Sequence, residues 1–316
     1  MYPDLSLREN VTHGTRECPL RTMHFQAGEG TPYPDHFFVK RHWHEYVEFI
    51  LITKGTYLFE INLENQILEE GDICMLNSGE PHEITGQGRA AMHEVVLFDP
   101  RILDFSYGDQ WQQEYMEPFL KKALVIQNVL HPRQKGYGEI RSAFERLMDR
   151  GLSRESGWYI SCKLSLLEIF YKFTEHQLFF PAGDVISPSS SRKIKRYKEI
   201  VSFMEEHYQD SLSLPQLGEQ FGCNSQYLCR FFREIAGVSP VQYLIGYRIE
   251  RACQLLERSS QPVTDVALEC GFENISYFIR KFRELRGCTP SEYRKAGDHG
   301  RHSPRTPIAE AKNISQ

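Results

Sequence analysis

Two histidines and one glutamate in the first third of the chain have residue types and a spacing that suit a metal ion. His42, His44 and Glu48 follow an HxHxxxE pattern within HWHEYVEF, residues 42–49. Imidazole nitrogens and carboxylate oxygens are common ligands of divalent metals. The same groups can also hydrogen-bond a polar small molecule. The pattern indicates a polar site and leaves both occupants open.

Alternation along an extended strand predicts which side chains share a face with this group. With a period of two residues, His42, His44 and Tyr46 lie on one side, and Glu48 continues that side. Trp43 lies on the other side. Inward positions of a small barrel line its cavity, so we expect a ligand pocket whether or not a metal is bound. The aromatic surface of Trp43 and Tyr46 favours a carbohydrate as the ligand.

Several short strands are expected around this group. Runs rich in β-branched and aromatic residues recur between Met23 and Phe98, separated by Gly55 and by turn sequences such as NSGEP. We expect YVEFILIT, TYLFEINL, DICML and HEVVLF to be separate strands of a small antiparallel sandwich or barrel.

Apolar residues recur at helical spacing between residues 137 and 180. Ile160, Leu164, Leu167 and Tyr171 form one stripe, which further apolar positions widen. The stripe is expected either to pack against the strands or to form a homodimer interface, and the sequence leaves both possibilities open.

The composition is that of a soluble protein with about two domains. The chain has 316 residues, of which 41% are hydrophobic and 25% charged. No apolar run approaches the roughly 18 residues that span a membrane, and no secretion signal is recognisable, so we expect a cytoplasmic protein without a membrane partner. Eight cysteines without a CxxC pair argue against a zinc ribbon or a disulfide framework.

A stretch rich in Pro, Gly and Ser, residues 181–194, is expected to be a linker between an acidic and a basic part. Residues 1–191 carry 18 Lys and Arg against 27 Asp and Glu, whereas residues 192–295 carry 16 against 13. The C-terminal part is therefore the expected partner of a polyanion. The tail, residues 296–316, has no periodic apolar pattern and is expected to be disordered.

An internal repeat dominates the C-terminal part. YLCRFFREIAGVSPVQY, residues 227–243, aligns with YFIRKFRELRGCTPSEY, residues 277–293, with 8 of 17 positions identical. Upstream, LGEQFG (217–222) aligns with VALECG (266–271), and the second copy has one more residue in its turn. Each copy is predicted as a helix, a turn with glycine, and a second helix, which is the helix-turn-helix pattern.

Local signals mark the ends of these helices. Ser213 begins a capping box in SLPQ, and Gly222 and Gly271 end the first helix of each copy. Asn224 and Asn274 are placed to cap the second helices.

The second helix of each copy is predicted to have an apolar inward face and a polar outward face. The inward residues are Leu228, Phe232 and Ile235 in the first copy and Phe278, Phe282 and Leu285 in the second. The outward residues are Gln226, Cys229, Arg230 and Arg233 in the first copy and Ser276, Ile279, Arg280 and Arg283 in the second. An arginine in the middle of such a face suits the O6 and N7 atoms of guanine in the major groove.

A single helix is predicted between the copies, from about Pro240 to Arg258. Its 19 residues make a rod about 28 Å long. A rod of this length can set two reading helices about one DNA turn apart, roughly 34 Å, on one face of a duplex.

Residues 195–295 resemble the DNA-binding domain of the AraC/XylS family over essentially its full length. The resemblance rests on LSLPQLGEQFGCNSQYLCRFFREIAGVSPVQYLIGYRIERACQLL and on the more specific VTDVALECGFENISYFIRKFRELRGCTPSEYR. It implies a seven-helix domain with two helix-turn-helix units that binds double-stranded promoter DNA. It also implies a transcription regulator, most often an activator that works with RNA polymerase.

By position, the resemblance assigns base reading to Gln226, Cys229 and Arg230 in the first unit and to Ile275, Ser276 and Arg280 in the second. Phosphate contacts suit Arg233, Lys281 and Arg283. The other candidate DNA-contacting residues are Asn224, Ser225, Asn274 and Ile279. Gly218 departs from the alanine usual at its place, which costs about 1 kcal/mol of helix propensity. Cys229 is a weak partner where a polar reader is common.

The strands resemble the cupin-type sensor domain that many members of this family carry. The matching patterns are His42-x-His44-x3-Glu48-x6-Gly55 and Gly71-x5-Asn77-x-Gly79-x2-His82. In metallo-cupins the matching residues bind metal, which implies the ligand set His42, His44, Glu48 and His82. Sensor cupins of the family often keep these histidines while binding an organic effector. Asn77 replaces the usual proline, and no Asn follows shortly after His82.

We therefore expect a multidomain chain: an N-terminal antiparallel β-barrel of cupin type (residues 1–136), coupling and dimerisation helices (137–180), and an all-α DNA-binding domain (195–295). The expected function is a ligand-responsive transcription regulator without enzyme activity or cofactor. The effector-binding candidates are His42, His44, Tyr46, Glu48, His82 and His93. The alternatives are a metal-dependent cupin enzyme and a metal sensor, each fused to a DNA-binding module.

Overall fold

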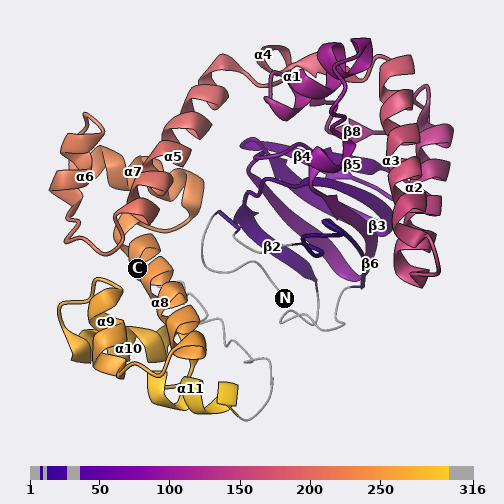
Figure 1. Ribbon diagram of the computed structural model, residues 1–316. Coiled ribbons are helices and arrows are strands. Elements are labelled where there is room, and N and C mark those ends of the chain that lie inside the picture. Colours follow the sequence, from indigo (N-terminus) through magenta and orange to yellow (C-terminus); the bar gives the residue numbers. More distant parts are fainter. Residues whose placement is uncertain (1–7, 10–12, 27–35, 299–316) are drawn as a thin grey trace. The chain divides into compact units, whose positions relative to one another are not determined.

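The computed structural model of the chain describes residues 8–9, 13–26 and 36–298. These residues form two compact units, 8–194 and 195–298. The first unit combines strands and helices, whereas the described part of the second contains helices alone (Figure 1). Within the described ranges, no helix is both long and apolar enough to cross a lipid bilayer. The expected fold class, a β-rich domain followed by a helical domain, is confirmed.

The named strands of the first unit pair in antiparallel fashion. Seven of them form one sheet in the order β1-β6-β3-β5-β8, in which β2 also pairs with β6 and β4 with β3, while β7 pairs with β9. Their bounds are β1 Leu20–Gln26, β2 Phe37–His42, β3 Val47–Ile61, β4 Glu64–Leu68, β5 Ile73–Leu76, β6 His82–Phe98, β7 Leu124–Ile126, β8 Val129–Leu130 and β9 Phe179–Pro181. Short helical turns connect them: η1 Pro100–Leu103, η2 Gln112–Met116 and α1 Glu117–Leu120.

Two long strands, β3 and β6, pair with each other along most of their length, and β3 has different further partners in its first and second halves. The first part of β3, residues 47–52, pairs with β5 and the second part of β6, whereas residues 56–61 pair with β4 and the first part of β6. The register shifts around Gly55, whose φ is 88°. The prediction of two strands here was wrong, because a left-handed glycine lets one bulged strand continue.

Alternation along β3 sends its side chains into two separate cores. Phe49 packs with helices α2 (Tyr137–Ser153) and α3 (Trp158–Glu175), which flank the sheet (Figure 1). Ile50 packs on the opposite side, among apolar residues of β4, β5 and β6. Because side chains alternate, Glu48 lies on the same side of the sheet as Ile50. This side, which we call the inner face, faces away from Phe49 and its helices, and the buried carboxylate of Glu48 lies on it.

Helix α3 divides the predicted apolar stripe between a buried and an exposed side. The residues that widen the stripe are buried against the sheet and α2, namely Leu166, Ile169, Phe170 and Phe173. Ile160, Leu164 and Tyr171 are instead 59%, 60% and 55% exposed. The helix therefore contributes both to the core of the first unit and to an apolar surface.

The stretch expected to be a linker, residues 181–194, is largely helical. Helix α4 spans Ala182–Val185, and α5 runs from Pro188 to Glu206, across the division between the two units. Proline is favourable in the first turn of a helix, and the hydroxyl of Ser187 accepts the backbone N–H of Ser190. The Pro and Ser residues here begin a helix.

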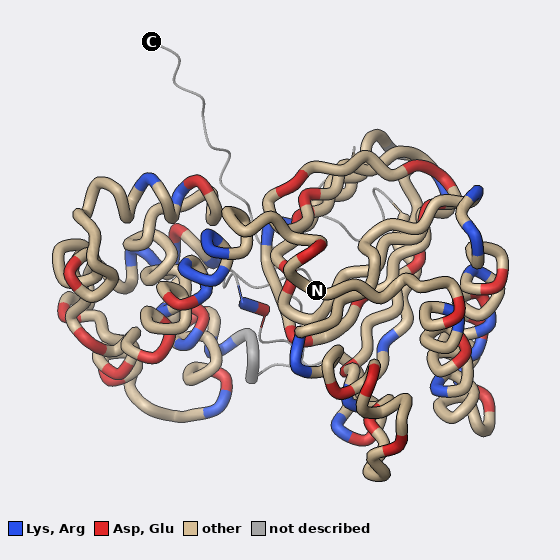
Figure 2. Tube along the Cα trace, turned by 90° about the horizontal axis from the view of Figure 1, so that it is seen from above, with Lys and Arg blue, Asp and Glu red and all other residues tan. Residues whose placement is uncertain are grey.

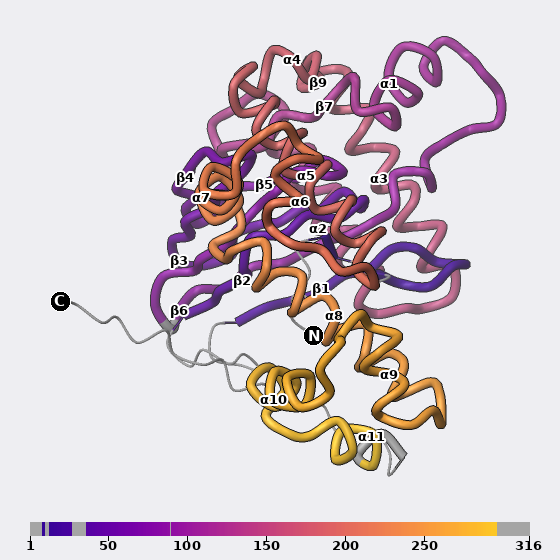
Figure 3. The backbone as a smooth tube through the Cα atoms, turned by 90° about the vertical axis from the view of Figure 1, so that its left-hand side faces the viewer, coloured from indigo at the N-terminus to yellow at the C-terminus, as the bar shows by residue number. Residues whose placement is uncertain are grey.

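The second unit contains the two predicted helix pairs joined by a rod. Its helices after α5 are α6 Leu214–Gln220, α7 Ser225–Ala236, α8 Pro240–Arg258, α9 Val263–Glu269, α10 Ile275–Arg286 and α11 Pro290–Asp298. Helix α8 has the predicted bounds and leads from α7 to the pair α9 and α10 (Figure 3). Of the expected disordered tail, residues 299–316 lie outside the described residues.

The predicted helix ends are confirmed. Ser213 and Gln216 form a capping box at α6. The Oδ1 atoms of Asn224 and Asn274 each accept a backbone N–H at 2.8 Å, from residues 227 and 277, at the start of α7 and α10. Such caps satisfy N–H groups that have no partner within the helix.

Gly218 is required by the tight turn between α6 and α7. A Cβ atom at this position would lie 2.5 Å from the carbonyl oxygen of Cys223. The turn of the first copy is one residue shorter than that of the second, where the matching Ala267 is fully buried. The helix propensity lost at Gly218 is therefore the consequence of a close approach of the backbone.

Candidate functional site

Strand pairing brings the histidines of the first unit together. His42 at the end of β2 pairs directly with His82 at the start of β6. His44 lies in the turn that follows, where its carbonyl oxygen accepts the N–H of Gly79 at 2.7 Å. All three rings are buried, and one ring nitrogen of each lies within 4.8 Å of those of the other two. We call this group, together with Glu48, the histidine cluster.

Backbone carbonyl groups orient all three rings. The Nδ1 atoms of His42, His44 and His82 lie 2.9, 3.0 and 2.8 Å from the carbonyl oxygens of residues 40, 46 and 80. Because a carbonyl oxygen only accepts hydrogen bonds, each Nδ1 carries a proton. The Nε2 atoms are therefore the groups that the cluster offers to a ligand.

Glu48 on β3 gives the cluster its negative charge. Its Oε2 lies 3.2 Å from Nε2 of His44 and 3.5 Å from Nε2 of His82. Burial alone would lower the pKa of His44, but the hydrogen bond and charge of Glu48 outweigh burial and raise it. Burial lowers the pKa of His42 and, further, that of His82. Within the cluster, Glu48 thus favours the protonated form of His44, whereas burial favours the neutral forms of His42 and His82.

Two residues that the sequence did not indicate, Glu9 and His13, border the cluster. Glu9 Oε2 lies 3.2 Å from Nε2 of His13 and 3.7 Å from Nε2 of His42. The backbone N–H of Glu9 donates to the carbonyl oxygen of Trp43 at 2.8 Å. Burial would raise the pKa of Glu9, but the hydrogen bond with His13 and the nearby histidine charges lower it. A second carboxylate therefore lies at the edge of the site.

The single-strand interpretation of residues 42–49 was wrong. Strand β2 ends at His42, a bend follows, and β3 begins at Val47. Trp43 is only 3% exposed, so its ring is part of the core and is not available to stack on a sugar. Tyr46 is half-buried, and its ring lies 6.2 Å from that of His44, close to the cluster. The cluster is assembled by a turn and by strand pairing.

His93, also a candidate from the sequence, lies in an aromatic environment. Its Nδ1 is 2.7 Å from the hydroxyl of Tyr57, and its ring centroid is 4.5 Å from that of Phe37 and 5.1 Å from that of Phe25. Burial, helped by the charge of His24, lowers the pKa of His93 to about 3. These contacts make His93 a neutral core residue, apart from the histidine cluster.

We predict that His93 makes the first unit less stable in mild acid. In the unfolded chain, His93 binds a proton below its ordinary pKa of about 6.5. In the folded chain, His93 stays neutral until the pH falls to about 3. Between these two pH values the free energy of unfolding therefore falls by about 1.4 kcal/mol for each pH unit of acidification. All three tryptophans, Trp43, Trp111 and Trp158, lie in the first unit, so their fluorescence during urea unfolding reports this unit. His93→Gln is expected to remove that part of the slope, and equal slopes in both proteins would contradict the prediction.

The second unit presents two polar helix faces built on the same plan. The inward residues of α7 are fully buried, as are Phe278 and Phe282 of α10, whereas Leu285 is half-buried. The exposed candidates are Asn224, Gln226, Arg230, Arg233, Asn274, Ser276, Ile279, Arg280 and Arg283. Half-buried are Ser225, Cys229, Ile275 and Lys281. Ile275 also packs against the core, which limits its reach outward.

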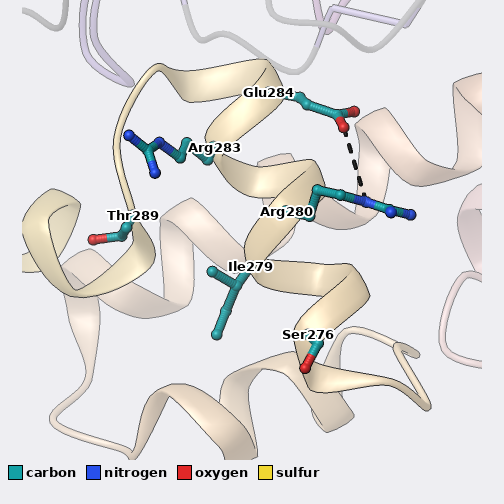
Figure 4. A pocket seen from close by; sticks show the side chains of 6 residues that line it. All are labelled: Ser276, Ile279, Arg280, Arg283, Glu284 and Thr289. Carbon is teal, nitrogen blue, oxygen red and sulfur yellow. Dashed lines mark ion pairs between the residues drawn. The ribbon is translucent and has the colours of Figure 1, made fainter.

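The outward face of α10 borders a hollow of about 500 Å³ (Figure 4). Ser276, Ile279, Arg280 and Arg283 follow one another along successive turns of α10, and Thr289 closes the hollow from the next loop. Arg280 Nε lies 3.9 Å from Glu284 Oε1, which makes an exposed ion pair. This ion pair involves only the Nε atom of the guanidinium group. Lys281 pairs more closely with Glu284, at 2.5 Å.

A tyrosine supports the central arginine of each face. The guanidinium carbon of Arg230 lies 5.9 Å from the ring centroid of Tyr227, and that of Arg280 lies 5.2 Å from that of Tyr277. The equivalent geometry in both copies follows from the repeated Y-x-x-R, which places the two side chains one helical turn apart. The stack restrains each arginine while leaving its donors exposed.

Two family descriptions match the chain. The AraC-like ligand binding domain matches residues 26–164, and the helix-turn-helix domain matches residues 217–296. The uncharacterized HTH-type transcriptional regulator YdeC of Bacillus subtilis is 25% identical over 296 residues, 92% of this chain and 97% of that protein. The HTH-type transcriptional activator RhaS of Escherichia fergusonii is 20% identical over 259 residues, 81% and 88% of the two chains. The solved C-terminal domain of the response regulator yesN of Fusobacterium nucleatum is 33% identical, covering 32% of this chain and 98% of that domain with a TM-score of 0.31.

Proposed function

Because this chain belongs to the AraC family of DNA-binding transcription regulators and carries a ligand-binding domain, we propose that it activates transcription in response to a small molecule held by the histidine cluster. The observation that carries the DNA-binding part is the pair of capped helices, α7 and α10, each with a central exposed arginine on a tyrosine. Activation is supported by relatives such as RhaS that are named activators.

The proposed DNA interface uses α7 and α10 as reading helices. Arg230 and Arg280 read guanine in the major groove, since exposed guanidinium groups match the O6 and N7 acceptors. Gln226 and Ser276 lie one turn before them and contact neighbouring bases. Arg233 and Arg283, one turn beyond Arg230 and Arg280, contact phosphate groups, and Cys229 and Ile275 contribute apolar contacts. Helix α8 sets the spacing of the two helices.

The proposed effector is an oxygen-rich small molecule such as a carbohydrate. The cluster offers Nε2 atoms and carboxylate oxygens on the inner face of the sheet, and Tyr46 and His13 add a hydroxyl and a further imidazole. Hydroxyl groups can both donate to and accept from such a set. Because the ring of Trp43 is buried, it cannot stack on a sugar ring. Recognition of the effector therefore depends on hydrogen bonds.

The full-length protein allows both parts to be tested in one experiment. A duplex covering the region upstream of its own gene is expected to shift in a gel in excess nonspecific DNA, whereas a scrambled duplex of equal composition is not. Trp43 lies between two cluster histidines, so a bound sugar from a panel is expected to change tryptophan fluorescence and the apparent DNA affinity together. Equal binding of both duplexes would contradict the proposal.

We further propose that the protein acts in the cytoplasm as a homodimer that contacts RNA polymerase. The exposed apolar side chains of Ile160, Leu164 and Tyr171 on α3 support a dimer interface, since large exposed apolar patches on proteins mark interaction sites. Around it, Lys, Arg, Asp and Glu alternate along α2 and α3 and can form a polar rim (Figure 2).

Leu164→Glu is predicted to weaken the dimer. Burying a leucine contributes about 2 kcal/mol, so two symmetric copies contribute about 4 kcal/mol, or about 1,000-fold in the dissociation constant. Analytical ultracentrifugation of the full-length protein checks this. The control is Ile67→Glu, at a residue of β4, not of α3, that is 65% exposed. A Leu164→Glu variant that dimerises like the control would exclude this interface.

A further inference from the structure

The two reading helices differ in the middle of their outward faces. Arg230 and Arg280 occupy matching positions, but the residue before each of them is Cys229 in α7 and Ile279 in α10. Cys229 is half-buried, whereas Ile279 is 38% exposed. The second unit therefore presents a branched apolar side chain to water beside its central arginine, where the first unit has a smaller and less exposed thiol.

The packing of α10 does not require an apolar residue at position 279. The core beneath this helix contains Phe278 and Phe282, which are fully buried, and Ile275 and Leu285 pack against it. Within the described part of the chain, Ile279 does not belong to that cluster. A single exposed apolar residue is common on protein surfaces, so the groups around Ile279 decide what it can bind.

Hydrogen-bonding groups surround Ile279 on the outward face of α10. Ser276 lies one turn before it and Arg283 one turn after it, and both line the hollow of about 500 Å³ with Thr289 (Figure 4). Of the six residues that line the hollow, all within the described ranges, Ile279 alone is apolar. A molecule that enters the hollow therefore meets one apolar contact point among donors and acceptors.

The major groove of DNA matches such a face at one base in particular. Thymine presents its C5 methyl group there, whereas the other three bases present hydrogen-bond donors and acceptors. Cytosine lacks this methyl group and has the N4 amino donor instead. An isoleucine against that amino group leaves the donor without a partner, which costs free energy. Ile279 therefore favours a T·A pair over a C·G pair.

The thymine is expected next to the guanine that Arg280 reads. Consecutive Cα atoms lie about 3.8 Å apart, close to the rise of about 3.4 Å between successive base pairs. The guanidinium carbon of Arg280 lies 5.2 Å from the ring centroid of Tyr277, and this stack restrains the arginine. Ile279 and Arg280 can therefore contact neighbouring base pairs in the same groove.

We propose that Ile279 selects a thymine beside the guanine in the DNA segment read by α10, through contact with the C5 methyl group. The inference rests on the proposed function, in which α10 is a reading helix, and adds a base preference that the two arginines do not supply. In α7, Cys229 replaces the isoleucine, and Gln226, one turn before Arg230, suits adenine. The two segments of one site therefore differ in sequence, and the bound chain has a fixed direction on the DNA.

The test first compares DNA selection by the full-length wild type and by two variants of Ile279. From a random pool of duplexes, the wild type is expected to enrich a thymine next to the guanine of one segment. Ile279→Val keeps a branched apolar side chain and is expected to keep this thymine. Ile279→Ser is expected to lose the thymine and keep the guanine, because Arg280 is unchanged. Circular dichroism checks that both variants keep their helices.

The enriched duplex then tests the methyl group itself. Replacing the selected thymidine by deoxyuridine removes only the C5 methyl group and keeps the base pair. Fluorescence anisotropy is expected to show about 4-fold weaker binding by the wild type and by Ile279→Val, which corresponds to one buried methyl group. Ile279→Ser is expected to bind both duplexes equally.

The outcomes separate this inference from the proposed function. Enriched guanine without a neighbouring thymine, or equal binding of both duplexes by the wild type, would overturn the role of Ile279 and leave the reading helices in place. A methyl effect of the same size in folded Ile279→Ser would also overturn it, because another residue would then contact the methyl group. A wild type that enriches no sequence would instead contradict the proposed function, and the inference with it.

Discussion

Replacing Arg230 and Arg280 together by alanine is expected to abolish sequence-specific DNA binding. Each arginine lies exposed at the centre of a reading helix, and a bidentate contact to guanine contributes about 1–3 kcal/mol. The two residues belong to separate helix-turn-helix units without shared partners, so their effects add to about 2–6 kcal/mol, or about 30-fold to 10⁴-fold in affinity. Fluorescence anisotropy with the upstream duplex measures this loss at fixed salt.

The control for this double variant is Arg141→Ala on α2. Arg141, a half-buried arginine, is paired with a glutamate four residues later, as Arg280 is with Glu284. It therefore removes a similar ion pair from the first unit, and we expect unchanged DNA affinity. Specific binding that persists in the double variant would show that α7 and α10 do not read the bases.

Phe282→Ala is expected to unfold or severely loosen the second helix-turn-helix unit. The ring is fully buried, 5.7 Å from that of Phe278 and 5.6 Å from that of Tyr293. Removal of a buried phenylalanine costs about 3–5 kcal/mol, because burial is lost and a cavity remains. Urea unfolding followed by circular dichroism is expected to show an earlier helical transition, and DNA affinity is expected to fall with it.

Two controls show whether the loss of stability is confined to the second unit and is caused by the buried position of Phe282. The tryptophan transition of the first unit is expected to stay in place, since no tryptophan lies in the second unit. Leu268→Ala, at a residue of α9 that is 58% exposed, is expected to change the free energy of unfolding by less than about 0.5 kcal/mol. Equal stability of the Phe282→Ala and Leu268→Ala variants would contradict the proposed core.

The second unit was largely predictable because its signals are local. The caps at Asn224 and Asn274 bond to residues three positions later, and the bounds of α8 follow from a serine and proline at one end and polar residues at the other. Because the helix pair is repeated in the sequence, the cap and turn signals also occur twice. Gly218 was misinterpreted as a simple propensity cost, because its close neighbour, Cys223, is recognised only when the turn is seen in three dimensions.

The histidine cluster was predictable in its members but not in its construction. His42, His44, Glu48 and His82 were expected together on the basis of the cupin-like spacing, yet the bend after His42 was missed, because alternation assumes an uninterrupted strand. Glu9 and His13 reach the site through contacts with Trp43 and Tyr46, more than 30 residues away in the chain. Single-sequence patterns hold no signal for such long-range contacts.

The burial of the apolar stripe on α3 could likewise not be predicted from the sequence alone. Period alone cannot distinguish a helix buried on one side from one that uses two adjacent faces. In the structure the line of Ile160 and Leu164 is exposed, while Leu166 and Phe170 pack inside. Only the position of the sheet therefore tells which apolar residues of α3 are buried and which are exposed.

The most direct test of the central claim is selection of DNA by the full-length protein from a random pool of duplexes. Two reading helices joined by α8, a rod of about 28 Å, predict an enriched site with two conserved segments about one helical turn apart, roughly 10 base pairs. Arg230 and Arg280 predict guanine in each segment. Enrichment of one short segment would contradict the paired reading helices, and a pool that stays random after repeated rounds would contradict sequence-specific regulation altogether.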